Sequence, residues 1–351
     1  MVYLQVKAAL LTEFNAPLTI VEAGLTQLQY GQVLVKILCS GICGAQLQEI
    51  RGEKSAVKLP CALGHEAAGI VESVGIGVNN VKTGQKVVLH WRKGAGIESP
   101  FPEYQVPELK GRYATPAYFD TITSGRVTTF NEYSIVSENR CTPVPDDTPD
   151  ELCALLGCGL STALGTVENE AQLAFGESVL ILGVGGLGVN LIIASKMRHA
   201  GRIAACDIHE SKRDVANKLG AEFFTSDCLA KHESHFDCII DTTGHAEVFK
   251  SALPKLKGGG RYIMVGQPKP GQALSIENAR HLFDGEGKRI MATQGGGFKP
   301  HLDIPRYVAM HKAGRLSLDG IVSDRLPLSE INHGLDLVRS GQASRVMVKM
   351  T

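Results

Sequence analysis

The chain has 351 residues, which exceeds the usual size of one domain, so its length predicts two lobes. Its 36 basic and 36 acidic residues cancel and form no dense basic run, which speaks against a nucleic-acid-binding protein. Nine irregularly spaced cysteines, no apolar run of membrane-spanning length and no signal-like N-terminal stretch predict a cytoplasmic protein without a membrane partner.

The N-terminal part of the chain has the pattern of a β-rich, barrel-like lobe. Short apolar runs interrupted by Gly, Pro and Asn extend from residue 6 to about residue 142. Strands are expected at residues 32–38, 68–74, 86–91 and 131–136. The proline-rich stretch 143–149 is the expected junction to the next lobe.

The central part alternates helices with buried strands, which is typical of a parallel sheet. Helices are expected at residues 151–156, 188–199, 212–219 and 246–256. Strands are expected at residues 178–182, 202–206, 238–241 and 261–265. Helices at 305–313 and 329–340 then precede a strand at 345–350 that is expected to return to the first lobe. The predicted domains are 1–153, 154–297 and 298–351, of which the first and last share one lobe.

A glycine-rich turn, Gly183-Val184-Gly185-Gly186-Leu187-Gly188, follows a predicted strand and opens a helical segment. The first glycine permits a tight turn, Gly185 lets the backbone approach a pyrophosphate, and Gly188 lets helix and strand pack closely. Asp207 stands 24 residues past Gly183, at the end of the next strand, where a carboxylate binds ribose hydroxyls and repels a 2′-phosphate. The expected cofactor is therefore NAD, bound by Gly183, Gly185, Gly186, Leu187, Gly188 and Asp207.

Two basic residues close to Asp207 bear on the choice of cofactor. Lys212 and Arg213 would favour NADP if they faced the nucleotide. We expect them instead on the solvated face of the following helix, which leaves NAD as the prediction.

Three separate segments carry residues of the types that bind zinc: Cys43, the pair His65-Glu66, and Cys158. Two thiolates and one imidazole leave the fourth tetrahedral position open, as in catalytic zinc sites. The spacing alone does not establish a site, because a buried cysteine is usually a small apolar side chain.

These segments have a family resemblance, in order and over essentially the whole chain. Gly41-Ile42-Cys43-Gly44, Leu63-Gly64-His65-Glu66, Gly157-Cys158-Gly159 and the glycine turn resemble those of the medium-chain, zinc-dependent alcohol and polyol dehydrogenases. The resemblance implies an α/β fold, with a GroES-like, β-rich catalytic lobe formed by both ends of the chain. It also implies a central Rossmann lobe, a doubly wound parallel sheet, with the active site between the lobes.

The same resemblance implies roles for individual residues. Cys43, His65 and Cys158 would bind one catalytic zinc, and Glu66 would bind or release the metal as water exchanges. Thr162 and Val265 would lie beside the nicotinamide, and Arg345 would reach the cofactor phosphates. Relatives are commonly homodimers or homotetramers built through the Rossmann sheets, so an oligomer is expected, with residues 261–265 and 273–276 at its interface.

The sequence departs from the family pattern in two places. No cysteine lies between Cys61 and Cys141, so the structural zinc that many relatives hold is not expected. Relatives also carry a hydroxyl residue, an Asp and a His where this chain has Ala45, Gln46 and Gln48. Ala45 cannot relay a proton, and Gln46 lacks the charge with which such a partner orients a metal-bound His.

Two explanations of the missing relay stay open. In the first, which we favour, the substrate proton leaves through Glu66, His90 or a metal-bound water. In the second, the site is catalytically weak and the chain is an NAD-binding protein without turnover.

The substrate pocket is expected beside Ala45, Gln46, His90 and Trp91. An indole face packs on the C–H face of a sugar or cyclitol, and its N–H can donate a hydrogen bond, although Trp91 could also be purely structural. The predicted reaction is reversible oxidation of a secondary alcohol, a polyol, sugar or cyclitol derivative, by hydride transfer to NAD with zinc as Lewis acid. A zinc-free quinone or enone reductase is the alternative enzyme.

Overall fold

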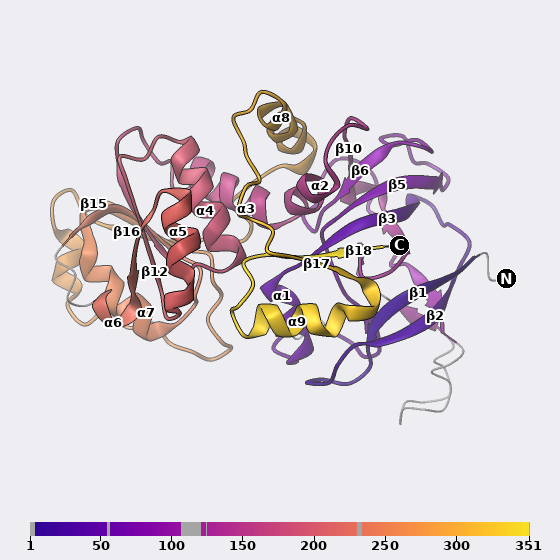
Figure 1. Cartoon of the computed structure of the whole chain (residues 1–351), viewed down its shortest axis with the longest axis horizontal. Helices are drawn as coiled ribbons and strands as arrows, with labels where there is room; N and C mark the ends of the chain where they lie inside the picture. Colours follow the sequence, from indigo (N-terminus) through magenta and orange to yellow (C-terminus); the bar gives the residue numbers. More distant parts are fainter. Residues whose placement is uncertain (1–3, 55–56, 107–120, 124, 230–233, 351) are drawn as a thin grey trace. The chain divides into compact units, whose positions relative to one another are not determined.

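The computed structural model describes residues 4–54, 57–106, 121–123, 125–229 and 234–350. The chain forms two compact units, drawn in Figure 1. The first unit comprises Met1–Cys158, Lys299–Ser317 and Val322–Thr351, and the second comprises Gly159–Phe298 and Leu318–Ile321. The chain therefore enters the second unit after Cys158.

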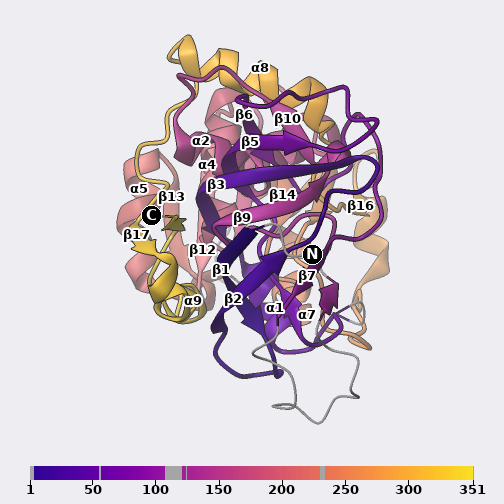
Figure 2. The same cartoon turned by 90° about the vertical axis from the view of Figure 1, so that its right-hand side faces the viewer.

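The first unit is built on two sheets that are mostly antiparallel. The smaller has the order β4 (Cys61–Ala62), β1 (Leu4–Leu11), β2 (Thr19–Leu25), β7 (Glu103–Gln105) and β8 (Thr121–Thr123). The larger has the order β10 (Cys141–Pro143), β6 (Lys86–Leu89), β5 (Ala67–Val74), β3 (Gln32–Ile42), β18 (Val346–Lys349) and β17 (Asp324–Pro327), and β9 (Tyr133–Ser137) also pairs with β3. Figure 2 shows β3 and β5 side by side. The β-rich first lobe is thereby confirmed.

The last strand returns to the first unit, as the sequence predicts. β18 pairs antiparallel with β3, with Val346 opposite Ile42 and Lys349 opposite Cys39. Helix α9 (Ile331–Arg339) packs its apolar face on both strands, because Ile331 and Leu335 share a buried cluster with Ile42. The two ends of the chain thus share one core.

Three further helices belong to the first unit: α1 (Gly44–Ile50), α2 (Asp150–Leu156) and α8 (Pro300–Lys312). α2 has no exposed apolar residue between Leu152 and Leu156, and it packs on β3 and β5. The stretch 143–149 therefore lies inside this unit, because the helix after it needs these strands to cover its apolar side chains. The expected junction at 143–149 is wrong.

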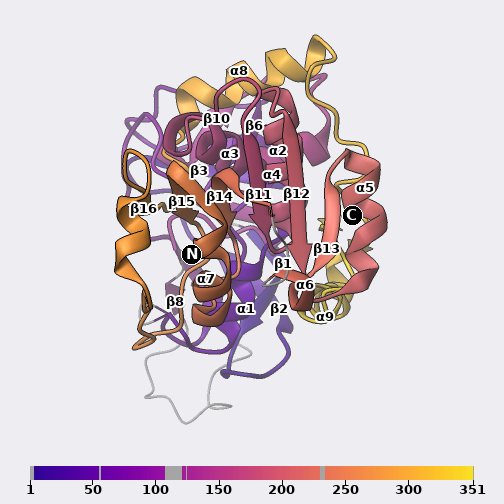
Figure 3. The ribbon, with the colours of Figure 1, turned by 90° about the vertical axis from the view of Figure 1, so that its left-hand side faces the viewer.

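The second unit contains a six-stranded parallel sheet (Figure 3). Its order is β13 (Glu222–Thr225), β12 (Arg202–Asp207), β11 (Ser178–Leu182), β14 (Phe236–Asp241), β15 (Leu256–Met264) and β16 (Arg289–Ala292). Read from the first strand of the unit, this is the order 3-2-1-4-5-6 of a dinucleotide-binding Rossmann fold. The predicted parallel sheet is confirmed, and the chain reverses its strand order beside β11.

The helices of the second unit are α3 (Gly159–Gly165), α4 (Gly186–Met197), α5 (Arg213–Leu219), α6 (Ser226–Leu229) and α7 (Ala246–Ala252), with a π-helical turn at Thr166–Glu170. The helix expected at 246–256 ends early, since Pro254 lacks the N–H that a continuing helix needs. Strand β15 starts at Leu256 instead. Among the described residues, no helix is both long and apolar enough to cross a membrane.

A buried arginine fastens the sheet of the second unit to the loop before β11. Arg261, on β15, donates to the carbonyls of Ala171, Gln172 and Asp237 and pairs with both oxygens of Glu177. Its side chain is 8% exposed and that of Glu177 is 26% exposed. Burial lowers the pKa of Arg261, but Glu177 outweighs it, so the net pKa lies above its ordinary value.

We expect Arg261→Leu to lower the free energy of unfolding by about 3 kcal/mol, because three carbonyls and a partly buried carboxylate lose their donor. Urea unfolding followed by circular dichroism measures the change. The control is Arg202→Leu, whose pair with Glu222 is 36% and 53% exposed and should contribute about 1 kcal/mol or less. Equal losses in the two variants would contradict the anchoring role of Arg261.

Candidate active site

Three ligand-type side chains converge at one end of the larger sheet of the first unit. Cys43 follows β3, His65 stands in the loop before β5, and Cys158 follows α2. Their candidate ligand atoms all lie within 4.8 Å of one another. This is the set that the sequence singled out.

Two glycines make the convergence sterically possible. Gly64, just before His65, has φ +89°, and a Cβ there would lie 2.3 Å from the Thr129 hydroxyl. A Cβ at Gly157 would lie 2.3 Å from the carbonyl oxygen of Leu89. Any side chain at either position would push Cys158 or His65 away from the other ligands.

The donor set fits a zinc ion. His65 Nε2 is buried and makes no hydrogen bond within the described part of the chain. The pKa of the Cys43 thiol lies well below its ordinary value because the Cys158 thiol hydrogen-bonds to it, and the pKa of Cys158 is raised by the same bond. One imidazole and two sulfurs at this spacing leave room for one further ligand on a tetrahedral ion. Cys43, His65 and Cys158 would hold such a metal.

Glu66 adjoins this set but is held by a cation. Its fully buried carboxylate pairs with Arg345, whose side chain is 4% exposed. Arg345 stands just before β18, and the pairing of Val346 with Ile42 brings it beside Cys43. Burial would lower the pKa of Arg345, but Glu66 and the sulfurs of Cys43 and Cys158 raise it above its ordinary value.

Arg345 keeps one unused donor. Its Nε is buried without a hydrogen-bond partner in the part of the chain that the structure describes. The sequence did not pair Arg345 with Glu66, because 279 residues separate them. Glu66 pairs with Arg345 through Oε1, and its role as a metal ligand stays a prediction.

Gln46 occupies the place of the charged partner that relatives have. It is 1% exposed, on the first turn of α1, and its Oε1 accepts the Cys43 backbone N–H at 2.9 Å. Its Nε2 lies 2.6 Å from His65 Nδ1. Gln46 therefore contacts two ligand residues, at the position where the family pattern places the partner of a metal-bound His, and its expected place in the substrate pocket stays a prediction. Ala45, beside it, is half-buried and brings no polar atom.

His90 and Trp91, the other expected pocket residues, differ in their surroundings. His90 is fully buried, with Nδ1 2.8 Å from the Arg92 carbonyl and Nε2 2.9 Å from the Thr142 hydroxyl. Burial lowers its pKa to about 3. A neutral ring with both nitrogens engaged is a poor carrier for a substrate proton, which argues against the route through His90.

Trp91 is half-buried, and its Nε1 is buried without a hydrogen-bond partner among the described residues. The guanidinium of Arg92 lies 5.5 Å from its ring centroid. Trp91 thus presents an indole N–H that the described chain leaves unpaired.

In the second unit, the glycine turn has the geometry that dinucleotide binding requires. Gly183 has φ +88°, and a Cβ at Gly188 would lie 1.9 Å from the Gly183 carbonyl oxygen. A Cβ at Gly185 would meet nothing within 4 Å, so this backbone borders open space at the N-terminus of α4. Gly183 and Gly188 are needed for the turn and its packing, and Gly185 leaves access for a phosphate.

The side chain of Asp207 hydrogen-bonds to that turn. It ends β12, and its two oxygens accept the N–H groups of Val184 at 2.6 Å and His209 at 2.9 Å. Lys212 is 4% exposed, and burial lowers its pKa, so its expected place on a solvated helix face is wrong. Arg213 instead pairs with Glu210 and stacks 4.9 Å from the ring centroid of Phe223.

Two other residues expected at the cofactor lie in the same unit. Thr162 is buried within α3, at 6% exposure, and Val265 follows β15 and donates its N–H to the Asp241 carbonyl.

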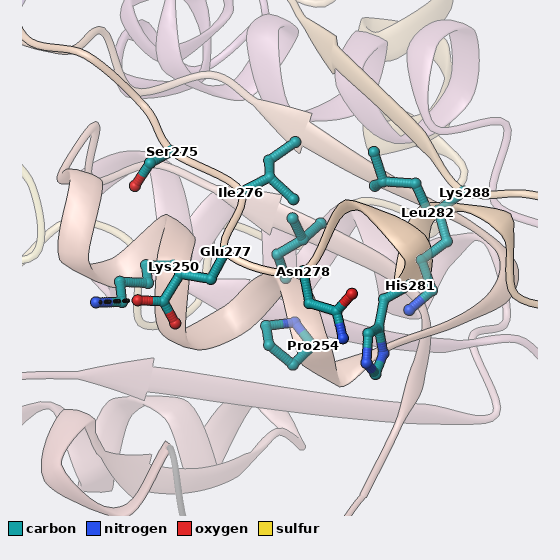
Figure 4. Close-up of a pocket in the computed structure, with 10 residues that line it drawn as sticks. Lys250, Pro254, Ser275, Ile276, Glu277, Asn278, His281, Leu282 and Lys288 are labelled. Atoms are coloured by element: carbon teal, nitrogen blue, oxygen red, sulfur yellow. Dashed lines mark ion pairs between the residues drawn. The ribbon is translucent and has the colours of Figure 1, made fainter.

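A pocket elsewhere in this unit was not predicted (Figure 4). It is lined by Lys250, Leu253, Pro254, Ser275, Ile276, Glu277, Asn278, His281, Leu282 and Lys288. Its Lys250 and Glu277 pair with each other at 2.7 Å, so they balance each other's charge.

Comparisons with known proteins agree with this site. Residues 29–146 match the alcohol dehydrogenase GroES-like domain, and residues 186–327 match the zinc-binding dehydrogenase family. Alcohol dehydrogenase 6 of Peromyscus maniculatus is 30% identical, and alcohol dehydrogenase class-3 of Pisum sativum 31%, each over 97% of both chains. The solved benzyl alcohol dehydrogenase of Acinetobacter calcoaceticus has a TM-score of 0.86 at 26% identity, covering 99% of this chain and 100% of its own.

The chain belongs to the zinc-dependent alcohol dehydrogenase family. The resemblance inferred from the sequence is confirmed. The predicted class of enzyme is also confirmed: the chain is an NAD- and zinc-dependent oxidoreductase that acts on CH–OH groups of small alcohols.

We expect Cys158→Ser to weaken zinc binding by more than roughly 100-fold, because it removes a direct ligand. Loss of a residue that only hydrogen-bonds to a ligand typically weakens metal binding by about 10–100-fold. Competition with a chromophoric chelator at fixed pH measures the zinc affinity of the variant and of the unchanged chain, and so reports the loss. The control is Cys153→Ser, at a buried cysteine of α2 five residues earlier, whose pKa burial raises to about 12. An unchanged zinc affinity in Cys158→Ser would exclude Cys158 as a ligand.

We expect Asp207→Asn to weaken NAD binding about tenfold and to narrow the preference over NADP, because the charge that binds ribose hydroxyls and repels a 2′-phosphate is lost. Calorimetric titration with both dinucleotides measures the change. Asp214→Asn, at an exposed position of α5, is the control for net charge. Unchanged NAD affinity in Asp207→Asn would remove the assignment.

Proposed function

We propose that the chain interconverts a secondary alcohol and its ketone, and that the alcohol is a polyol, sugar or cyclitol derivative. The observation that carries the proposal is the convergence of Cys43, His65 and Cys158, with His65 Nε2 left without a partner. A zinc bound there would supply a Lewis acid that polarises the alcohol oxygen. Hydride would pass to NAD, for which the glycine turn and Asp207 supply the binding groups.

For the cofactor we keep the assignments that the resemblance implies. Gly183, Gly185, Gly186, Leu187, Gly188 and Asp207 are proposed to bind the nucleotide, and Thr162 and Val265 the nicotinamide. Arg345 is proposed to serve two partners. It neutralises Glu66, and its unpaired Nε is a donor for the cofactor phosphates.

The substrate class rests on Trp91. Its ring offers an apolar face to C–H groups, and its unpaired N–H offers a donor to a hydroxyl oxygen. A substrate with hydroxyls on several carbons uses both properties, whereas a simple alkyl alcohol uses the face alone. The relative from Acinetobacter is named for benzyl alcohol, so an aromatic alcohol belongs among the substrates to be tried.

The proton of the alcohol needs a route that avoids the groups already engaged. Ala45 has no hydroxyl, and both nitrogens of His90 are hydrogen-bonded. Glu66 is held by Arg345. We propose that the proton passes to water, since none of these three side chains is placed to accept it.

The same observations favour a second candidate, an NAD-binding protein with a weak or inactive site. A third, a zinc-free quinone or enone reductase, would not need the convergence of Cys43, His65 and Cys158. The zinc content of the purified protein separates the zinc-free reductase from the proposed alcohol dehydrogenase. Turnover separates the alcohol dehydrogenase from an NAD-binding protein with an inactive site.

We further propose a cytoplasmic homodimer or homotetramer. All nine cysteines are free, which suits a reducing compartment. Residues 261–264 cannot form the expected interface through their backbone, because β15 is already paired with β14 and β16. The edge strand β16 is the proposed contact instead.

We expect the zinc-loaded protein to reduce NAD with at least one member of a panel of polyols, sugars, cyclitols and benzyl alcohol, followed by NADH absorbance. Trp91→Ala should raise KM for that substrate about tenfold or more, with little change in KM for NAD. Trp91→Phe keeps an aromatic face and removes the indole N–H, so it separates the effect of stacking from that of the hydrogen bond. Parallel rises in both KM values would mean that Trp91 is structural, and no turnover by a protein that binds NAD would favour the second candidate.

A further inference from the structure

The amide of Gln46 is held in one orientation by a donor that cannot change its role. The Cys43 backbone N–H donates to Gln46 Oε1 at 2.9 Å, at the start of α1. Because the carbonyl of the amide faces Cys43, its NH₂ group faces His65 Nδ1 at 2.6 Å. Gln46 is 1% exposed, so water does not offer either group an alternative partner.

This orientation determines which nitrogen of His65 carries the proton. An amide NH₂ only donates, so Nδ1 must accept with its lone pair. In a neutral imidazole the proton then stands on Nε2. Nε2 is the ring nitrogen that has no partner and lies with the sulfurs of Cys43 and Cys158.

A metal needs that same nitrogen unprotonated. To bind one through Nε2, the ring must carry its proton on Nδ1, which would then point at the NH₂ group of Gln46. The alternative is to turn the amide over, which places its NH₂ against the Cys43 N–H. Either arrangement sets two donors against each other in a buried place, and such a mismatch is costly.

We propose that Gln46 is a positioning residue that holds His65 in the tautomer opposed to metal binding, so that this chain binds zinc weakly and exchanges it readily. The inference rests on the proposed function, since it takes Cys43, His65 and Cys158 as the zinc ligands. A carboxylate at position 46 would have no such conflict. One oxygen would accept the Cys43 N–H and the other the Nδ1–H of His65.

The variant Gln46→Glu tests this with almost no change of shape. Zinc affinity is measured by competition with a chromophoric chelator at fixed pH, and we expect Gln46→Glu to bind about 10–100-fold more tightly than the unchanged chain. The matched control is Gln48→Glu, which adds the same charge on the same helix at a half-buried position. Unchanged affinity in Gln46→Glu, or an equal gain in Gln48→Glu, would overturn the proposal.

The tautomer itself can be read without metal or substrate. In zinc-free protein with ¹⁵N-labelled histidine, long-range ¹H–¹⁵N correlation should show the His65 proton on Nε2, and on Nδ1 in Gln46→Glu. A His65→Asn variant identifies the signals. A proton on Nδ1 in the unchanged chain would overturn the proposal.

The outcomes distinguish this inference from the proposed function. If the unchanged chain binds zinc and turns over alcohol but Gln46→Glu binds no tighter, the role of Gln46 fails alone. If neither the unchanged chain nor Gln46→Glu binds zinc at Cys43, His65 and Cys158, the proposed function fails, and the inference fails with it.

Discussion

The pairing of β18 with β3 is the interaction on which the metal-ligand end of the first unit depends. β3 leads into Cys43 and β18 follows Arg345, so their antiparallel register sets a guanidinium beside a thiol and next to Glu66. Without Arg345, the buried Glu66 would lose its cation, and loss of the partner of a buried charge costs several kcal/mol. With both cysteines deprotonated to bind a metal, two thiolates and one carboxylate would carry three negative charges, which a divalent ion and one guanidinium would balance. Strand register and electrostatics therefore depend on each other here.

The sequence was a good guide wherever a local pattern decides the structure. The parallel sheet follows from alternating helices and buried strands, and Gly183, Gly185 and Gly188 each have a steric or access role that their spacing predicts. The ligand set was reached through resemblance rather than spacing, because Cys43 and Cys158 meet only through the packing of α2 on β3 and β5.

What the sequence missed depends on contacts between distant residues or on side-chain direction. Glu66 and Arg345 are 279 residues apart, and no local pattern links them. His90 stands at the end of β6, and only the structure shows that its ring faces Thr142. Lys212 is buried despite its charge, because the turn before α5 places it beside Asp207 rather than in solvent. The short helix α1 carries too few residues to show a period, so the sequence named Gln46 but did not predict the helix that positions it.

Because residues 159–298 are inserted between the two parts of the first unit, the ribosome makes all six strands of the parallel sheet before β17 and β18. Until β18 is made, β3 lacks its partner at residues 39–42, and an unpaired strand edge is a template for pairing with another chain. Glu66 also lacks its cation during this interval. The metal-ligand end is thus the last part of the first unit to mature, and an edge of β3 stays open until the final strands emerge.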